Sequence, residues 1–563
     1  MTIDAQNSST SLVSVKNLSV DFHMKDQRVQ AVREVSFELM RGEILGVVGE
    51  SGSGKSVMCR SLLGLLPATA SASGTVSFEG RDLSNLSDDQ WRSIRGKQAS
   101  MIFQNPSSHL DPLMTAGTHV AEPLRHHEGA SASDARASAI DLLQTVGIAD
   151  PAHRVDAFPH ELSGGMKQRV MIASAIACKP KFLIADEPTT ALDVTVQARI
   201  LDLLKDLNRK QNLTIIFVSH DLGVISEICD RVLVMKDGKV VEQGTTEDVI
   251  LRPKDPYTQL LINSQPSVRA RLRQQSQGGA QLVQANAAKP VMSIKGLAVE
   301  FIGKQAALFG LLGGVSIPPV KALRNISMDI HKGEVVGIVG ESGSGKSTLA
   351  RVITRLQKPT AGSVTYEGQD IADFSASDLI NYHREVQMAF QNPFDSLNPR
   401  FTVRQTIAEP LIVHKLVPRS QVEARTSELM NLVELPEMLS ARRPRQLSGG
   451  QCQRVGIARA LAMEPKVLIA DEITSALDVT IQAQILDLLE RIREKEDLTI
   501  IYISHDLAIV RMICSRVAVF KEGQLIEIGD VGGVLDNPRE DYTRTLIASA
   551  PHFSNQQALS SRL

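Results

Sequence analysis

The sequence predicts an α/β protein built from two tandem copies of one domain. Two observations carry this prediction. The stretch GESGSGKS occurs at 49–56 and again, with the same eight residues, at 340–347, each time between a short apolar run and a helical pattern. Four further short motifs follow in the same order and at nearly the same spacing in both halves. Such self-similarity indicates tandem duplication, and 563 residues are enough for two separate cores.

The duplicated stretch fits the pattern of a phosphate-binding P-loop, G-x-x-x-x-G-K-[ST]. Glycines let successive backbone N–H groups curve round phosphate oxygens, and the following helix adds the positive end of its dipole. The lysine can reach the β- and γ-phosphates, and the next hydroxyl suits Mg²⁺. The predicted phosphate-binding residues are Gly49, Ser51, Gly52, Ser53, Gly54, Lys55 and Ser56 in copy one, and Gly340, Ser342, Gly343, Ser344, Gly345, Lys346 and Ser347 in copy two.

The neighbourhood of each P-loop fits the motif. The apolar runs at 43–48 and 334–339 predict buried parallel strands before the loops. Helices are expected over 58–65 and 349–356 after them. Strand, loop and helix in this order are the setting that the motif requires, and finding it twice excludes a chance glycine-rich turn.

The overall composition sets limits on function. Lys and Arg number 61 against 63 Asp and Glu, so the net charge gives no case for a nucleic-acid binder. The N-terminal residues 1–12 lack the basic and apolar segments of a signal peptide, and no apolar run is long enough to span a bilayer. A role at a membrane would therefore require docking onto partners.

The five cysteines argue against a cysteine-based site. They form no C-x-x-C pair and lie far apart, so a disulfide framework, a zinc site or an iron–sulfur cluster is not expected. A reducing compartment is the simplest interpretation. The cysteines are Cys59, Cys178, Cys229, Cys452 and Cys514.

Each copy opens with alternating apolar residues, which predict antiparallel strands. These strands are expected at 12–22 and 31–39 in copy one, and at 291–301 and 322–330 in copy two. Phe22 and Phe301 close the first strand of each copy. Each is either a ring that stacks on adenine or an ordinary strand residue, and the sequence favours neither.

Copy two carries extra residues between Phe301 and its P-loop, around 305–319, with the apolar run LFGLL at 308–312. We interpret this insertion as a loop folded onto its own domain rather than as a docking element.

The strands predicted at 100–104 and 386–391 end in Gln104 and Gln391. A glutamine at the carboxyl end of a parallel strand lies where ligands bind in such sheets. A polar middle segment follows in each copy. Its helix starts are predicted by the capping-box spacings Ser131-x-x-Asp134 and Ser420-x-x-Glu423, with helical apolar spacing beyond them. We therefore expect a small helical subdomain inserted in each α/β domain.

The triplets Ser163-Gly164-Gly165 and Ser448-Gly449-Gly450 precede helical patterns. An N-cap accounts for each serine. It does not account for two glycines at a helix start, which cost stability, so the close approach of another group is the better explanation. An exposed helix N-terminus of this kind suits an anion.

Paired acids follow two buried strands, at 182–186 and 467–471. An N-capping acid would explain one member of each pair but not both. Because adjacent strand residues point to opposite faces, we expect different roles for the two acids. The aspartates suit Mg²⁺ and the glutamates suit polarisation of the attacking water. The pairs are Asp186-Glu187 and Asp471-Glu472.

A histidine follows the next predicted strand of each copy, at 214–218 and 499–503. A single histidine would carry little information. His220 and His505 occupy equivalent strand ends in domains that already hold a P-loop, so we interpret them as γ-phosphate contacts.

Taken in order, these motifs resemble the nucleotide-binding subunits of ABC transporters, over nearly the whole chain outside its tails and linker. The resemblance implies a RecA-like α/β core, ATP and Mg²⁺ as cofactors, and ATP hydrolysis. It also implies head-to-tail pairing of the two domains, with each ATP held between one P-loop and the other domain's LSGG motif.

Residue by residue, the resemblance implies two crossed sites, and since both keep their glutamate, both are expected to hydrolyse ATP. Ser56, Gln104 and Asp186, and Ser347, Gln391 and Asp471, would hold the metal. Asp193 and Asp478 match the loop where the domains meet. Site one would comprise Phe22, Gly49–Ser56, Gln104, Asp186, Glu187 and His220, closed by Ser448–Gly450; site two would comprise Phe301, Gly340–Ser347, Gln391, Asp471, Glu472 and His505, closed by Ser163–Gly165.

Further motifs are similar to those of the dipeptide, oligopeptide and nickel import ATPases. They are QNP, LDP and AEPL at 104–124, QNP, LNP and AEPL at 391–411, and P-Y-T and D-Y-T at 256–258 and 541–543. Because both domains share one chain, the sequence also resembles the single-chain ATPases of some glutathione and peptide importers. The cysteine cluster that some relatives carry after P-Y-T is missing, so no iron–sulfur site is implied.

This subfamily resemblance implies a peripheral protein at the cytoplasmic face of the inner membrane. Its implied partners are two membrane-spanning permease subunits and, through them, a periplasmic or extracellular substrate-binding protein. No nucleic acid is implied, and membrane association would be indirect.

The alternative is a soluble twin-ABC ATPase that acts on ribosomes or nucleic acid. Translation-factor members usually carry a long charged helical linker, and DNA-repair members carry zinc-binding cysteines. The predicted linker here, 266–290, is short, rich in Gln and Ala, and without apolar periodicity, so we expect it to be flexible. An exporter would normally carry its membrane spans in the same chain.

The expected boundaries are tail 1–11, domain 12–265, linker 266–290, domain 291–553 and tail 554–563.

Overall fold

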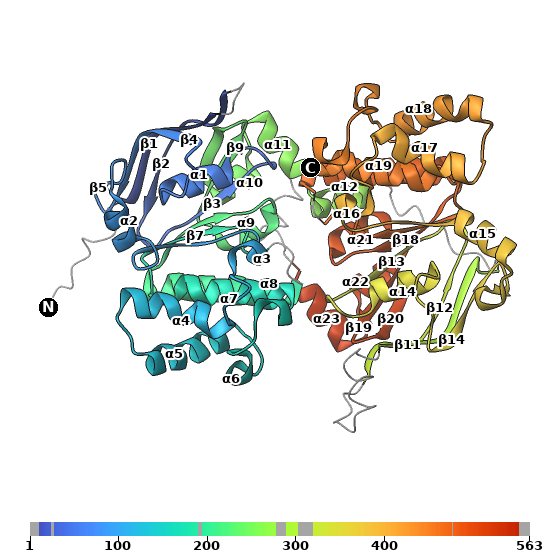
Figure 1. Cartoon of the computed structure of the whole chain (residues 1–563), viewed down its shortest axis with the longest axis horizontal. Helices are drawn as coiled ribbons and strands as arrows, with labels where there is room; N and C mark the ends of the chain where they lie inside the picture. The colour runs from blue at the N-terminus through green and yellow to red at the C-terminus, as the bar shows by residue number, and fades with distance from the viewer. Residues whose placement is uncertain are drawn as a thin grey trace. The chain divides into compact units, whose positions relative to one another are not determined.

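The computed structural model describes residues 11–23, 28–189, 194–276, 289–301, 319–475 and 477–550. It forms two compact units, one ending at Gln265 and the other running from Pro266 to Ala550. Each unit has the architecture of an ABC nucleotide-binding cassette expected from the sequence: a mostly parallel sheet, a separate antiparallel sheet and a helical subdomain (Figure 1).

The central sheet of each unit has six strands, parallel except for the hairpin at one edge. The first unit has the order β10-β9-β3-β8-β7-β6, and the second has the equivalent order β20-β19-β13-β18-β17-β16. The strands are β3 (Ile44–Val48), β6 (Ala99–Ile102), β7 (Phe182–Asp186), β8 (Thr214–Val218), β9 (Arg231–Lys236) and β10 (Lys239–Thr245), then β13 (Val335–Gly340), β16 (Val386–Ala389), β17 (Val467–Asp471), β18 (Thr499–Ile503), β19 (Arg516–Lys521) and β20 (Gln524–Asp530).

Every residue of β3, β7 and β8 is buried, as it is in β13, β17 and β18. Continuous Val and Ile runs suit strands that are covered on both faces. The sequence-predicted strands before the P-loops and before the paired acids are confirmed.

The antiparallel sheets are confirmed too. Their orders are β2-β1-β4-β5 and β12-β11-β14-β15. In Figure 1, β1, β2 and β4 lie on the other side of the central sheet from helices α4 and α5. The strands are β1 (Ser11–His23), β2 (Arg28–Met40), β4 (Ala70–Phe78) and β5 (Arg81–Asp82), and β11 (Met292–Phe301), β12 (Val320–Ile330), β14 (Ala361–Tyr366) and β15 (Gln369–Asp370).

The helices after the P-loops begin at the lysines themselves, three residues earlier than the apolar pattern indicates, because the loop glycines lead directly into the first turn. The helices of the first unit are α1 (Lys55–Leu62), α2 (Asp88–Ile94), α3 (Pro106–His109), α4 (Ala116–His127), α5 (Ala132–Thr145), α6 (Pro151–Arg154), α7 (Gly164–Ile176), α8 (Val194–Gln211), α9 (Leu222–Ile228), α10 (Thr246–Leu251) and α11 (Pro256–Asn263).

The helices of the second unit follow the same plan, with one addition at the start, α12. They are α12 (Pro266–Ser276), α14 (Lys346–Ile353), α15 (Ala376–Glu385), α16 (Pro393–Ser396), α17 (Val403–Val413), α18 (Val422–Leu432), α19 (Gly449–Leu461), α20 (Val479–Glu496), α21 (Leu507–Ile513), α22 (Val531–Asp536) and α23 (Asp541–Ala548).

The inserted helical subdomains are formed around α4 and α5, and around α17 and α18. Ser131 caps α5 as predicted, its Oγ accepting a hydrogen bond from the backbone N–H of Asp134 at 3.1 Å. The equivalent prediction for Ser420 is wrong. Ser420 lies inside a 3-10 turn, Arg419–Gln421, and α18 begins at Val422 without a side-chain cap. The turn supplies the entry into this helix, so a capping serine is not needed.

The predicted flexible linker is wrong for its first eleven residues, 266–276, which form helix α12 in the second unit. Ala270 is buried in that unit's apolar core. Arg269 contacts Asp487 and donates to the carbonyl of Ala483 at 3.1 Å, and Arg273 contacts Glu490, all on α20. Tertiary contacts therefore stabilise a helix that the sequence's low apolar periodicity does not reveal.

Several predictions fall outside the described residues. These are the tails apart from residue 11, the linker residues 277–288, Asp193, and the insertion around 305–319 apart from its last residue. Where the structure describes the chain, no helix has both the length and the apolar character needed to cross a bilayer. The five cysteines are free and buried.

Candidate active sites

Four loops meet at one edge of each central sheet. In the first unit they follow β3, β6, β7 and β8, which are neighbouring parallel strands, so their carboxyl ends lie at the same edge. These loops carry the P-loop, Gln104, the Asp186-Glu187 pair and His220. The second unit repeats the arrangement. The structure thus brings together, within each unit, side chains up to about 170 residues apart.

The P-loop glycines have conformations that other residues rarely adopt. Gly54 has φ 98°, and a Cβ there would lie 2.4 Å from the carbonyl oxygen of Ala31. Gly52 has φ 81°, but a Cβ there would meet nothing within 4 Å. Gly54 is required because the backbone of Ala31 lies against it, whereas the space beside Gly52 is open. This is the arrangement expected of a loop that curves round an anion.

The P-loop lysines are buried and point back at their own loops. Lys55 Nζ donates to the carbonyl oxygens of Gly49 and Glu50, both at 2.7 Å. Lys346 Nζ does the same toward Gly340 and Glu341, both at 2.8 Å. Each ammonium group therefore lies inside its loop, and its role toward phosphate stays a prediction.

Ser56 and Asp186 are joined by a hydrogen bond of 3.0 Å, from Oγ to Oδ1. The second oxygen, Oδ2 of Asp186, is buried and has no hydrogen-bond partner among the described residues. Burial raises the pKa of Asp186 above its ordinary value. An orphaned buried carboxylate oxygen beside a hydroxyl fits a hard divalent cation. Ser347 and Asp471 form the same pair at 3.3 Å, and burial likewise raises the pKa of Asp471.

Glu187 adopts a left-handed backbone conformation, with φ 49°, and Glu472 does so with φ 47°. Neither lies in the preceding strand, so the sequence-based argument from opposite strand faces is wrong for them. The two acids do have different hydrogen-bond partners, and their different roles stay a prediction. Glu187 accepts a hydrogen bond from Gln104 at 2.8 Å, and Glu472 accepts one from Gln391 at 2.6 Å. Strained backbone of this kind is typical of functional sites.

The histidines lie beside the glutamates. His220 Nδ1 is 3.7 Å from Glu187 Oε1, and His505 Nδ1 is 3.5 Å from Glu472 Oε1. Burial alone would lower the pKa of His505, but the hydrogen bond and negative charge of Glu472 raise it above its ordinary value. Conversely, burial alone would raise the pKa of Glu472, and His505 brings it below its ordinary value. The second unit therefore holds its glutamate as a carboxylate.

The Ser-Gly-Gly triplets of the two LSGG motifs lie at the starts of two thirteen-residue helices, α7 and α19. Ser163 Oγ and Ser448 Oγ each accept a backbone N–H of the first turn at 3.3 Å, so the N-cap interpretation of both serines is confirmed. A Cβ on Gly164 would meet nothing within 4 Å, and one on the equivalent Gly449 would make only an ordinary contact with Leu477 at 3.5 Å. Their role toward a nucleotide stays a prediction.

The two candidate aromatic residues differ. Phe22 is half-buried and packs against the apolar core of its own unit. Phe301 is 41% exposed at the end of β11. The role of either ring toward adenine stays a prediction.

Sequence reasoning missed the role of two tyrosines. From the sequence, the P-Y-T and D-Y-T motifs indicate only the subfamily, and no function is assigned to their tyrosines. In the structure, Tyr257 and Tyr542 contact the backbone of the two P-loops. The signal that could have found them is their repetition at equivalent positions after both domains.

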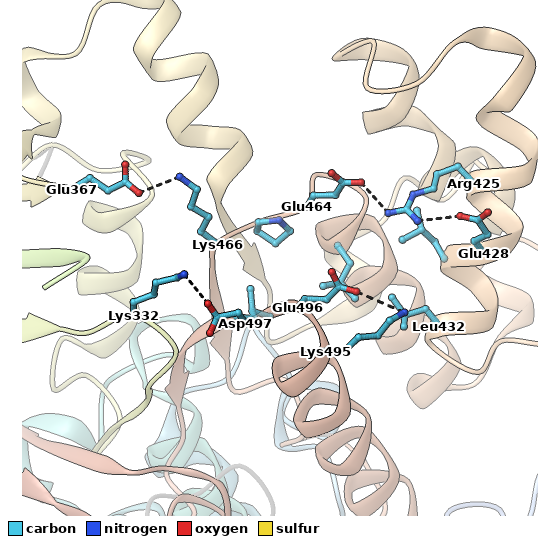
Figure 2. Close-up of a pocket in the computed structure, with 14 residues that line it drawn as sticks. Lys332, Glu367, Arg425, Glu428, Leu432, Glu464, Lys466, Lys495, Glu496 and Asp497 are labelled. Atoms are coloured by element: carbon cyan, nitrogen blue, oxygen red, sulfur yellow. Dashed lines mark hydrogen bonds and ion pairs between the residues drawn. The ribbon is translucent and has the colours of Figure 1, made fainter. Parts of the chain in front are cut away.

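A cavity of about 680 Å³ lies at the opposite edge of the second unit's sheet, where β17 and β18 begin. Figure 2 shows its charged side chains facing one another. Lys332 pairs with Asp497 at 2.7 Å and Lys466 with Glu367 at 3.1 Å. Because its charges neutralise each other, we assign it no ligand.

Comparisons with known proteins agree with this geometry. Residues 32–190 and 323–475 match the ABC transporter family, and residues 241–289 and 526–562 match the C-terminal region of oligopeptide/dipeptide transporters. The chain is 42% identical to proteins named glutathione import ATP-binding protein GsiA. For the protein of Salmonella paratyphi A the match covers 96% of this chain and 90% of the relative, and for that of Escherichia coli K12 it covers 98% and 90%.

A solved structure of an ATP-binding cassette, MJ0796, dimeric and bound to ADP and Pi in a post-hydrolysis state, is 33% identical. The match covers 42% of this chain and 98% of the MJ0796 chain, with a TM-score of 0.39.

Proposed function

Since the chain belongs to the ABC transporter family, we propose that it is the ATP-hydrolysing subunit that powers import of di- or oligopeptides, or glutathione-like peptides, across the bacterial inner membrane. The observation that carries the proposal is the C-terminal region of oligopeptide/dipeptide transporters, which follows both cassettes. The relatives named for glutathione import support a small peptide as substrate.

In each proposed site the P-loop binds the ATP phosphates, and its lysine, oriented by the backbone carbonyls of the loop, reaches the β- and γ-phosphates. The serine, aspartate and glutamine of that site would hold Mg²⁺, which when bound neutralises charge on the phosphates. Glu187 and Glu472 polarise the attacking water, and His220 and His505 contact the γ-phosphate. The orphaned Oδ2 of Asp186 supports the metal assignment.

The two sites are proposed to be crossed. Each P-loop is closed by the LSGG triplet of the other cassette, Ser448–Gly450 for site one and Ser163–Gly165 for site two. ATP would then join the cassettes, and hydrolysis would release them. The open space beside Gly164 supports a helix start that receives a ligand from outside its own unit.

The proposed partners are two membrane-spanning permeases and, through them, a substrate-binding protein outside the membrane. The chain would be peripheral, at the cytoplasmic face. Two exposed apolar side chains that follow Gln104 and Gln391 in the sequence support docking: Leu113 is 84% exposed and Phe394 is 45% exposed. Aspartate at both positions should reduce co-purification with membranes while leaving nucleotide binding intact.

The function is tested by uptake. A strain lacking the gene should lose import of labelled glutathione, or of a labelled dipeptide or oligopeptide, and the wild-type gene should restore it while K55A/K346A should not. Normal uptake of all three peptide types would refute the import proposal. Co-sedimentation with ribosomes or binding to nucleic acid would favour the alternative of a soluble twin-cassette ATPase.

A further inference from the structure

One peptide group in each P-loop is held from both ends. It joins Gly49 to Glu50 in the first unit. Its carbonyl oxygen, on Gly49, accepts the ammonium group of Lys55 at 2.7 Å. Its N–H, on Glu50, donates to the phenol oxygen of Tyr257 at 3.0 Å. Because a trans peptide is planar, with C=O and N–H pointing in opposite directions, fixing one group orients the other.

The second unit repeats this arrangement with different residues. Gly340 accepts Lys346 at 2.8 Å, and the N–H of Glu341 donates to the phenol oxygen of Tyr542 at 3.3 Å. Its occurrence at equivalent positions in both units makes a coincidental contact a poor explanation.

The tyrosines are themselves fixed in place. Lys236 Nζ lies 4.8 Å above the ring of Tyr257, and Lys521 Nζ lies 4.8 Å above the ring of Tyr542. Both lysines are the last residues of strands β9 and β19, next to the strand that leads into the P-loop. Each ring therefore packs between the sheet and the loop, where its hydroxyl has little freedom to move.

The turn before each tyrosine is anchored to the same sheet. In the first unit, the carboxylate of Glu242 on β10 accepts the backbone N–H groups of Lys254 and Asp255 at 2.9 and 3.1 Å. Glu527 on β20 accepts those of Arg539 and Glu540 at 3.0 and 3.3 Å. Both glutamates and both tyrosines lie in the stretches that match the oligopeptide/dipeptide transporter C-terminal region, outside those that match the ABC cassette.

We infer that Tyr257 and Tyr542 are positioning residues for ATP binding: each orients the first P-loop peptide so that its carbonyl faces the P-loop lysine. The C-terminal region of each unit thus acts on the nucleotide site of its own cassette. This inference rests on the proposed assignment of the P-loops as nucleotide sites.

The test compares phenylalanine variants of the full chain, which keep the ring and remove the hydroxyl. Y257F/Y542F should raise the Kd for Mg·ADP and the KM for ATP by about two- to tenfold, the range of one net hydrogen bond. The kcat at saturating ATP should stay within about twofold of the parental value, because the tyrosine hydrogen bond affects nucleotide binding rather than the chemical step. Y257F should have the larger single effect, since its hydrogen bond is the shorter.

The matched control is Y366F. Tyr366 is also buried, and its hydroxyl donates to Glu385 at 2.8 Å rather than accepting a P-loop N–H. Y366F should lower the Tm without changing the Kd for Mg·ADP. An unchanged Kd in Y257F/Y542F, or an equal change in Y366F, would overturn the inference. If the double variant does not fold, Y257F alone decides for site one. A K55A/K346A variant that binds Mg·ADP normally would instead refute the site assignment.

Discussion

The side-chain nitrogen Nε2 of Gln104 lies 2.8 Å from Oε2 of Glu187 and donates a hydrogen bond to it. This bond joins a predicted metal ligand to the predicted base across 83 residues of sequence. Gln391 and Glu472 repeat it in the second unit. In each unit this hydrogen bond therefore links the loop after one strand to the loop after its neighbour.

Removing the P-loop lysines should abolish most hydrolysis. Lys55→Ala or Lys346→Ala takes away the buried ammonium group that each loop offers to the phosphates. We expect the ATPase rate of the double variant in the assembled transporter to fall by on the order of 10²-fold, with transport lost in parallel. Lys179→Ala, at an exposed turn, is the control and should have the parental rate. Normal turnover by the double variant would refute the assignment.

Glu187→Gln together with Glu472→Gln should separate binding from hydrolysis. Glutamine keeps the shape of the side chain but cannot act as a base, so hydrolysis should fall by roughly 10²- to 10⁴-fold while Mg·ATP still binds. ATP retention by filtration and phosphate release are the measurements. Glu247→Gln, in the exposed first turn of α10, should change neither. Parental hydrolysis in the double variant would place the base elsewhere.

The pKa of His505 should depend on Glu472. In the native pair the pKa of His505 lies above its ordinary value of 6.5, because the hydrogen bond and charge of Glu472 outweigh burial. In Glu472→Gln burial dominates, so the pKa should fall below 6.5. An NMR titration of ¹³C-labelled histidine measures it, with Glu187→Gln as the matched control. A pKa that does not change in Glu472→Gln would contradict the pairing.

The same pair predicts how stability depends on pH. The raised pKa of His505 contributes stability that is present below pH 6.5 and is lost as pH rises through the folded pKa. The lowered pKa of Glu472 contributes stability that is present above pH 4.5 and is lost as pH falls through its folded pKa. The pair is therefore fully formed between these values, and Glu472→Gln should lower the Tm more near pH 6 than at about pH 9.

Helix α12 should depend on its two arginines. Arg269→Ala with Arg273→Ala removes the contacts to Asp487 and Glu490, and the donor to the carbonyl of Met512 at 3.3 Å. Trypsin should then cut after Arg271, the one tryptic site that the double variant keeps in 266–276, several times faster than in the parent, as mass spectrometry of the fragments would reveal. Arg92→Ala, which breaks an exposed pair on α2, should not change this cleavage. Equal cleavage in the parent protein would show that α12 does not stay docked.

The crossed sites give a prediction about double variants. Ser448→Arg should obstruct site one although its P-loop is untouched. Losses within one functional unit are not additive, so Lys55→Ala with Ser448→Arg should be little worse than either change alone. Lys55→Ala with Ser163→Arg should be much worse, since each change disables a different site.

The measurement is the ATPase rate of the three single and two double variants in the reconstituted transporter. If the Ser448 double variant is the more damaging, each LSGG triplet serves its own P-loop and the crossed arrangement is wrong. Because both serines also cap helices, Ser163→Ala and Ser448→Ala measure the loss of the hydroxyl, cap included, and separate it from obstruction by the arginine.

The sequence by itself determined the two cassettes, the strands and the residues at each sheet edge. The reason is local: continuous apolar runs form buried strands, and glycine patterns specify the P-loops. Since neighbouring parallel strands end at one edge, the order of motifs was enough to bring Lys55, Gln104, Asp186 and His220 together.

The tertiary structure decided what depends on contacts between distant residues. The sequence does not show that Glu187 lies beyond its strand in a left-handed conformation and contacts Gln104. An acid that continues the strand and an acid that ends it would follow the same local pattern. The sequence does not show that Tyr257 contacts Glu50, 207 residues away. Helix α12 has weak apolar periodicity and forms where Arg269 and Arg273 meet the acids of α20, because packing against a preformed surface supplies the free energy that short segments lack alone.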